Sequence, residues 1–192
     1  MTRPAHAFVL GYHGCDRGVG ERLLANTDRF VRSDRAYDWL GPGVYFWEND
    51  PQRAWEWAKS LVARGKIADA FVVGAVIDLG HCFDLTLREN IELLASAYDM
   101  LAGSGLVLPV NEGPTDDPDK VLRYRDCAVV KTVHALVDSK EGRAAGMKPF
   151  DTVRGLFVEG PEVYPGAGFH RLTHTQIAVR NDACIRGVFV PR

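Results

Sequence analysis

The chain has 192 residues, 46% hydrophobic and 25% charged, which is typical of one globular domain with a sizeable core. The formal net charge is −2, with acids and bases interspersed, which argues against bulk binding of nucleic acid through a basic face. No apolar run reaches the ~20 residues of a membrane span, and no secretory signal is recognisable, so we expect a cytoplasmic protein without a membrane partner.

The cysteines and histidines do not follow the spacing of a metal site. No Cys-x-x-Cys pair occurs, and the histidines are scattered. We therefore expect reduced thiols and no bound metal. The four cysteines are Cys15, Cys82, Cys127 and Cys184.

The first elements alternate between strands and helices. Residues 7–14 form a strand candidate that ends in glycines, followed by a short amphipathic helix over 18–25. Residues 26–40 are polar and irregular and predict a long loop. The β-forming residues 44–47 then predict a second strand.

Asp50 and Pro51 are a strong helix start, because Asp50 can cap free amides and proline at the first position loses no needed donor. Apolar residues then recur at helical spacing until Gly65. The apolar, β-branched stretch 71–79 predicts the next strand.

Two helices are expected in the middle of the chain. Thr86 and Glu89 match a capping box that opens a helix to about Leu101. Asp117-Pro118 repeats the helix-start pattern for a long helix through at least Ala135. Residues 86–141 therefore look like a helical insertion between two groups of strands.

The last part of the chain predicts strands over 152–159, 173–180 and 184–190. The short connection 181–183 suits a hairpin between the last two. Strands at both ends with helices between them predict an α+β fold with a largely antiparallel sheet, in a single domain over 1–192.

Three short segments carry the functional prediction. They are Gly11-Tyr12-His13-Gly14-Cys15; Gly41-Pro42-Gly43-Val44-Tyr45-Phe46-Trp47 with the capped helix from Asp50 to Ala58; and the late strand from Thr173 to Asn181. Each alone has an ordinary structural explanation. Together, in this order, they resemble the signature segments of the poly(ADP-ribose)-polymerase-like and diphtheria-toxin-type ADP-ribosyltransferases, over about residues 8–62 and 150–190.

The resemblance implies a split, largely antiparallel sheet with flanking and inserted helices, and NAD as co-substrate without a metal. On the family's pattern His13 donates to a ribose hydroxyl, Gly14 binds the nicotinamide carboxamide through its backbone, and Tyr45 stacks on the nicotinamide ring. These three residues would hold NAD bent, with its N-glycosidic bond exposed.

The third residue of the family's His-Tyr-Glu triad aligns with Gln176 here. A glutamine can orient the sugar through a hydrogen bond, but it can neither abstract a proton nor offer negative charge to a ribosyl cation. Synthesis of a polymer is therefore doubtful, and transfer of one ADP-ribose is the better prediction.

The helix after Tyr45 also departs from the pattern. Where the family places a small hydroxyl residue and a second stacking aromatic, direct spacing gives Arg53 and Glu56, with Trp47 and Trp57 close by. The predicted catalytic residues are His13, Tyr45 and Gln176, and the predicted NAD-binding residues are His13, Gly14, Tyr45, Phe46, Trp47, Arg53 and Trp57. The loop arginines Arg29, Arg32 and Arg35 are further candidates for the pyrophosphate.

Two neighbours of these residues carry weaker expectations. Cys15 could be a thiol nucleophile, but we expect its side chain to face away from His13. His174 shares a strand face with Gln176 and could touch the acceptor, although a surface position is the simpler expectation.

The predicted activity is mono-ADP-ribosylation of an unknown protein, nucleic acid or metabolite with release of nicotinamide. By analogy, such compact transferases include bacterial toxins and defence effectors that are restrained by an antitoxin protein. Two alternatives stay open. The chain could be a non-catalytic module that binds NAD or ADP-ribose, or an NAD glycohydrolase with water as the acceptor.

Overall fold

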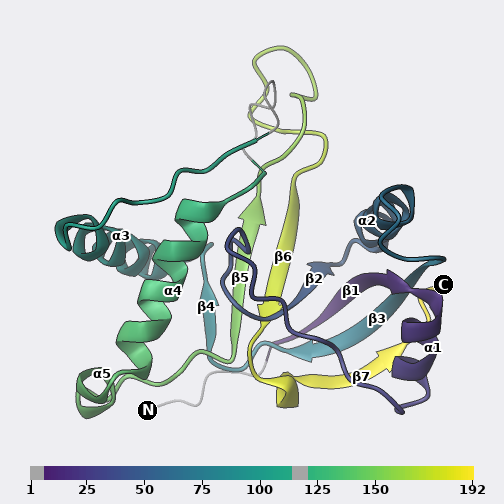
Figure 1. Ribbon diagram of the computed structural model, residues 1–192, viewed down its shortest axis with the longest axis horizontal. Coiled ribbons are helices and arrows are strands. Elements are labelled where there is room, and N and C mark those ends of the chain that lie inside the picture. The colour runs from purple at the N-terminus through teal and green to yellow at the C-terminus, as the bar shows by residue number, and fades with distance from the viewer. Residues whose placement is uncertain (1–6, 114–120) are drawn as a thin grey trace.

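The computed structural model describes residues 7–113 and 121–192 (Figure 1). Over this part of the chain, seven strands form one open sheet in the order β4-β5-β6-β2-β1-β3-β7, together with five α-helices. Neighbouring strands run antiparallel, except that β4 and β5 are parallel. The expected α+β class with a largely antiparallel sheet is confirmed.

The strands are β1 (Phe8–Asp16), β2 (Val44–Glu48), β3 (Ala70–Asp78), β4 (Cys82–Asp84), β5 (Thr152–Phe157), β6 (His174–Val179) and β7 (Ile185–Phe189). The helices are α1 (Arg17–Leu24), α2 (Pro51–Ala63), α3 (Arg88–Gly103), α4 (Tyr124–Asp138) and α5 (Lys140–Ala144), with a 3-10 turn at Asp182–Cys184.

The first two helices begin where a side chain caps them. The Asp16 carboxylate accepts from the Gly18 N–H at 3.0 Å and starts α1. The Asp50 carboxylate accepts from the Arg53 N–H at 2.9 Å and starts α2, with Pro51 at its first position as predicted. Because this cap fixes where α2 begins, it also fixes the position of the Arg53 side chain in the first turn of the helix.

Helices α1 and α2 cover opposite faces of the β1–β3 part of the sheet. Gly20 of α1 lies against Phe71 and Val73, whereas Gly14 of β1 lies under Ala54 and Ala58 of α2. Since successive strand residues point to opposite faces, the odd-numbered residues of β1 and β3 face α1 and the even-numbered residues face α2.

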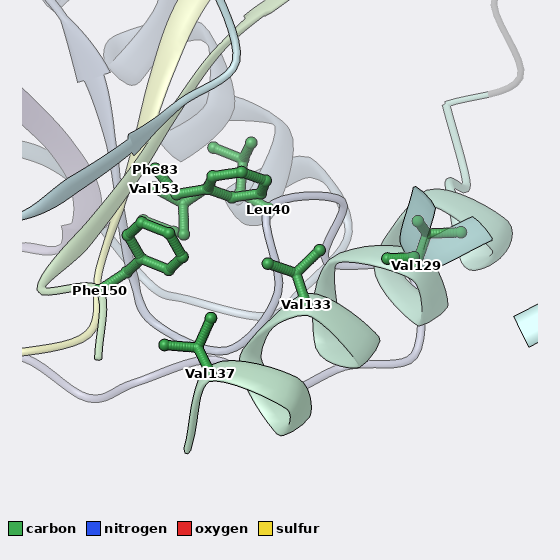
Figure 2. Close-up of a cluster of buried hydrophobic side chains, with 9 residues drawn as sticks. Leu40, Phe83, Val129, Val133, Val137, Phe150 and Val153 are labelled. Carbon is green, nitrogen blue, oxygen red and sulfur yellow. The ribbon is translucent and has the colours of Figure 1, made fainter. Parts of the chain in front are cut away.

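At the other end of the sheet, α4 packs its valines against the aromatic core. Figure 2 shows Val133 and Val137 on α4 directed towards Phe83 and Phe150, with Val129 of the same cluster further along the helix. Tyr45 of β2 packs against the same cluster. This end of the sheet therefore anchors β2, the strand that carries three of the predicted site residues, Tyr45, Phe46 and Trp47.

The hairpin predicted at 181–183 is wrong. Strand β6 lies between β5 and β2, so both of its edges are occupied and it cannot pair with β7. Instead, the Asn181 side chain accepts from the Ala183 N–H and begins a 3-10 turn. The chain then reaches the far side of the sheet, where β7 pairs with β3.

The capping box at Thr86 and Glu89 is also wrong. Helix α3 begins at Arg88 after Leu87, without a side-chain cap. The Thr86 hydroxyl donates to the Asp84 carboxylate at 2.7 Å, and the Thr86 N–H donates to the same oxygen. Thr86 is therefore tied to the end of β4 and does not cap the helix.

The middle helices connect two parallel strands. Strand β4 was not predicted, because three residues are too few to show alternation. It pairs with β5 in parallel, so α3, α4 and α5 form the crossover between them. The expected helix start at Asp117-Pro118 lies outside the described residues, and α4 begins at Tyr124.

None of the helices in the described ranges combines the length and the apolar character needed to cross a bilayer.

Candidate functional site

A cavity of about 700 Å³ opens beside the place where β1 and β2 separate. Its volume lies in the range of known small-molecule sites. Its walls come from β1, β2, α2, the 31–39 loop and the region around the β5–β6 connection. The structure brings all eight predicted site residues to it: His13, Gly14, Tyr45, Phe46, Trp47, Arg53, Trp57 and Gln176.

Where β1 and β2 separate, the His13 imidazole makes the hydrogen bond to β2 that the backbone of β1 would otherwise make. The β1–β2 register pairs Tyr12 with Trp47, and its continuation would pair Gly14 with Tyr45. The Tyr45 carbonyl instead accepts from the His13 Nδ1–H at 2.9 Å. The ring therefore satisfies the acceptor that β1 would otherwise pair, and the two strands diverge beyond it.

The backbone of Gly14 faces the resulting gap. The Leu10 carbonyl accepts from the Asn49 N–H, so the backbone polar groups of Leu10 point towards β2. In an antiparallel strand the backbone N–H and C=O groups of every second residue point the same way, so those of Tyr12 and Gly14 also point towards β2. The β1–β2 pairing ends at Tyr12, so the N–H and C=O of Gly14 face the cavity and not a neighbouring strand.

Position 14 has no room for a side chain. A Cβ there would lie 2.3 Å from the Ala54 carbonyl oxygen and 3.2 Å from the Ala58 Cβ. The glycine therefore lets α2 pack directly on β1. This close packing also brings the cavity-facing residues of α2 over the strand.

The tautomer of His13 follows from its partner. A carbonyl only accepts, so Nδ1 carries the proton and Nε2 of the neutral ring is an acceptor. Burial lowers the pKa of His13 below its ordinary value, while the bond to the Tyr45 carbonyl opposes the shift. The site therefore presents a neutral imidazole at pH 7.

Phe46 supports His13 from the opposite side of β2 to Tyr45. Its ring is 0% exposed, lies 5.7 Å from the His13 ring and contacts Phe30 edge to face. Phe30 in turn meets the His13 ring edge to face at 5.4 Å. We therefore assign Phe46 to positioning His13 and not to direct contact with a ligand.

The Tyr45 hydroxyl is fully engaged by the backbone. It accepts from the Leu40 N–H at 3.0 Å and donates to the Gly41 carbonyl at 2.9 Å. Burial raises the pKa of the Tyr45 hydroxyl above its ordinary value. Tyr45 can therefore offer the cavity its ring, while its hydroxyl holds the preceding loop in place.

Gln176 lies in a hydrogen-bonded chain of three side chains. The Trp39 indole Nε1 donates to Gln176 Oε1 at 2.6 Å. Gln176 Nε2 lies 2.9 Å from His174 Nε2, and His174 Nδ1 lies 2.6 Å from the Leu172 carbonyl. Since indole only donates and a carbonyl only accepts, each proton is assigned: Gln176 donates to His174 and keeps one further N–H.

His174 is buried, so the expected surface position is wrong. It is 5% exposed and stacks on Phe157 at 5.5 Å. Burial lowers the pKa of His174, and the nearby Arg53 acts in the same direction, whereas the bond to the Leu172 carbonyl and the Glu159 carboxylate oppose the shift. A neutral His174 is the acceptor that the Gln176 amide needs.

Helix α2 contributes a cation and an aromatic wall. Arg53 donates to Glu56 at 2.8 Å and to Glu159 at 2.7 Å. The Trp47 and Trp57 rings lie 6.0 Å apart at a tilt, and Arg64 covers the Trp57 ring. The cavity thus has extended aromatic surface beside a paired guanidinium.

The loop arginines are not equivalent. Arg32 also lines the main cavity, but its guanidinium pairs with Asp182 at 3.0 Å, and Arg29 lines a separate cavity. The guanidinium of Arg35 donates to the Tyr37 hydroxyl and lines the main cavity. Arg35 is therefore the loop cation best placed for a phosphate group.

Cys15 shares the face of His13, because residues two apart on a strand point the same way. The expectation that it faces away was wrong, and it lines the same cavity. It is 7% exposed, and burial raises its pKa to about 11. A protonated, buried thiol is a poor nucleophile.

Comparison with models of known protein families found no match, and no solved structure matches the chain. Among curated proteins, uncharacterized protein MJ0359 of Methanocaldococcus jannaschii is 28% identical over 149 residues, which cover 76% of this chain and 63% of that protein. The chain thus spans less than two thirds of the length of this relative.

Sequence reasoning missed three residues that shape the site: Trp39, Phe157 and Glu159. Trp39 lies in a loop without a motif, and Phe157 and Glu159 follow a strand pattern that favours core or surface equally. The spacing of two between Phe157 and Glu159 would place both on one face of β5 and its extension. That spacing does not show which face meets the cavity.

Proposed function

We propose that this protein is a mono-ADP-ribosyltransferase that uses NAD as co-substrate, transfers one ADP-ribose to an acceptor and releases nicotinamide. The observation that carries the proposal is the end of the β1–β2 pairing, where His13 bonds to the Tyr45 carbonyl and the Gly14 backbone faces a cavity. A strand N–H and C=O that face a cavity on one residue complement a primary carboxamide, which has one acceptor and a donor.

In the proposed complex, the Gly14 N–H donates to the nicotinamide carboxamide oxygen, and its C=O accepts from the carboxamide N–H. His13 Nε2 then accepts from a ribose hydroxyl, the reverse of the donation expected from the sequence. The rings of Tyr45 and Trp47 provide aromatic surface for the nicotinamide, each stacking contact adding roughly 0.5–1.5 kcal/mol beyond buried area.

Cleavage of the nicotinamide–ribose bond depends more on orienting NAD and stabilising charge than on a covalent enzyme intermediate. The bond between ribose C1′ and nicotinamide breaks, the electron pair leaves with nicotinamide, and the ribose develops oxocarbenium character. The free N–H of Gln176 would orient a ribose hydroxyl, since Trp39 and His174 hold the amide in one direction. An amide held in this way favours a single transfer over polymer synthesis.

The finer fold and setting are part of the same proposal. A split antiparallel sheet with flanking helices is the fold expected of such transferases, and the strand divergence at His13 is consistent with it. The four free cysteines favour a reducing compartment such as the cytoplasm. A role as a toxin or defence effector with an antitoxin partner is the biological setting that we propose.

The decisive experiment incubates the protein with labelled NAD, with and without a cell lysate, and measures bound NAD, free nicotinamide, free ADP-ribose and labelled macromolecules. We expect transfer by the wild type and its loss in His13→Ala, with His81→Ala as a control for an exposed histidine. Free ADP-ribose alone would indicate a glycohydrolase. NAD binding without nicotinamide release would indicate a non-catalytic module, and neither binding nor release would refute the proposal.

A further inference from the structure

We propose that Glu159 is the carboxylate that removes the proton from the acceptor, the task that Gln176 cannot perform. This inference rests on the proposed function. It concerns a residue on the extension of β5, outside the three segments that suggested the activity. Glu159 lines the same cavity as His13 and Gln176.

The local backbone turns Glu159 inward. Residues 156 and 158 are exposed, Phe157 is buried, and Glu159 continues this alternation. The Glu159 carbonyl accepts from the Leu172 N–H at 3.0 Å, which holds the extended segment beside the start of β6. Phe157, on the same face, stacks on His174.

The carboxylate lies across one imidazole ring from Gln176. Glu159 Oε2 is 3.7 Å from His174 Nδ1, and His174 Nε2 is 2.9 Å from Gln176 Nε2. A group that acts on the acceptor must stand near the residue that orients the sugar without overlapping it. Glu159 meets this condition.

Arg53 keeps Glu159 in a defined position. Its guanidinium donates to Glu159 Oε2 at 2.7 Å, and both side chains are about four-fifths buried, with 19% and 20% exposed. Both contacts of the carboxylate, to Arg53 and His174, use Oε2. Oε1 has no bonded partner in the described ranges and is the oxygen that would receive a proton.

The other carboxylates that line the cavity are already engaged. Asp16 accepts from three backbone N–H groups, those of Gly18, Ala68 and Asp69. Asp38 accepts from the Arg35 N–H at 2.6 Å and is 9% exposed. Asp34 lies on the exposed loop and pairs with Lys131 of α4. Among the described lining carboxylates, Glu159 is the one that lies beside His174, the hydrogen-bond partner of Gln176.

The proposed step balances as a simple displacement. The acceptor's O–H or N–H proton moves to Glu159 Oε1 while the acceptor heteroatom bonds to ribose C1′. The C1′–nicotinamide bond breaks, and its electron pair neutralises the pyridinium charge. Neutral nicotinamide leaves, and Glu159 later returns the proton to water.

The test compares Glu159→Gln with Glu56→Gln in the full chain. Glu56 is a matched control, because it is the other carboxylate bound to Arg53 but does not line the cavity. We measure NAD affinity by calorimetry, nicotinamide release in buffer, and transfer from labelled NAD into lysate macromolecules. Removing a general base lowers the rate by roughly 10²–10⁴-fold.

We expect Glu159→Gln to bind NAD within about threefold of wild type and to lose at least ~100-fold in transfer, while Glu56→Gln keeps both. Equal transfer by the two variants would overturn the inference, and so would joint loss of NAD binding and transfer in Glu159→Gln, since that marks a structural role. A wild type that neither binds NAD nor releases nicotinamide would refute the proposed function itself, an outcome distinct from these.

Discussion

Trp39 and Gln176 are joined by a 2.6 Å hydrogen bond from the indole Nε1 to the side-chain oxygen. The bond connects the long loop to β6 and leaves the amide nitrogen of Gln176 towards His174. A glutamate at position 176 could accept from Trp39 but could not donate to the neutral His174 ring. The surroundings of Gln176 are therefore built for an amide.

Replacing Gln176 by Glu should give a stability deficit that depends on pH. At high pH the new carboxylate and Nε2 of the neutral His174 ring would face each other as two acceptors, at a cost of about 1–3 kcal/mol. The new carboxylate favours the imidazolium, so the pKa of His174 rises above its low wild-type value. The deficit should be smallest at acidic pH and grow as pH rises through the variant's His174 pKa.

Urea unfolding of wild type and Gln176→Glu across this range measures the effect. Gln52→Glu adds the same charge on the exposed surface of α2, where repulsion with Glu56 should change only in the acidic range in which carboxylates ionise. A deficit that stays constant with pH would contradict the proton assignment.

Replacing Gly14 by Ala should destabilise the fold by about 1–3 kcal/mol, because the added Cβ meets the Ala54 backbone at 2.3 Å and α2 must move. Gly187→Ala is the control, since a Cβ at that strand position has nothing within 4 Å. Thermal unfolding of the two variants measures the effect, and we expect a lower melting temperature for Gly14→Ala than for Gly187→Ala. Equal melting temperatures would show that α2 does not need the glycine.

Replacing His134 by Phe should protect the protein from acid. His134 is 5% exposed, neither ring nitrogen has a partner in the described structure, and burial lowers its pKa to about 4. Unfolding restores a pKa near 6.5, so the wild type loses stability as pH falls from about 6.5 towards 4, by up to about 3 kcal/mol.

The Phe variant lacks this titration and leaves no polar group unsatisfied, so its free energy of unfolding should exceed that of wild type increasingly below pH 6.5. His81→Phe, at an exposed histidine that also stacks on Phe150, is the control. Parallel stability curves for wild type and His134→Phe would rule out a buried neutral His134.

Replacing Arg35 by Ala should weaken NAD binding about tenfold, as expected for the loss of one partly exposed charge-assisted hydrogen bond. Arg29→Ala removes the same charge from the same loop but outside the cavity, and should have little effect. Calorimetry at low and high salt tests this, since screening should shrink the Arg35 effect. Equal affinities in the two variants would exclude Arg35 from the pyrophosphate site.

Local patterns were enough for the elements of the N-terminal third. The Asp50-Pro51 start of α2 and the first strand depend on neighbouring residues, through caps and strand propensity. Helix α2 starts as predicted, whereas β1 continues past Gly14 to Asp16. The failures depend on how strands from distant parts of the chain pair. Thr86 bonds to Asp84 at the end of β4, a strand that forms by pairing with β5, and β6 has no free edge to which β7 could pair.

The candidate site divides in the same way. The sequence by itself determined that His13, Gly14, Tyr45 and Gln176 lie on strands or at their ends, because short-range order and composition specify these segments. Only the tertiary structure decided that the His13 ring replaces a strand partner and exposes the Gly14 backbone. It also decided that Trp39 orients Gln176, since a hydrogen bond across 137 residues leaves no local trace in a sequence, and that His174 is buried where it can accept from the same amide.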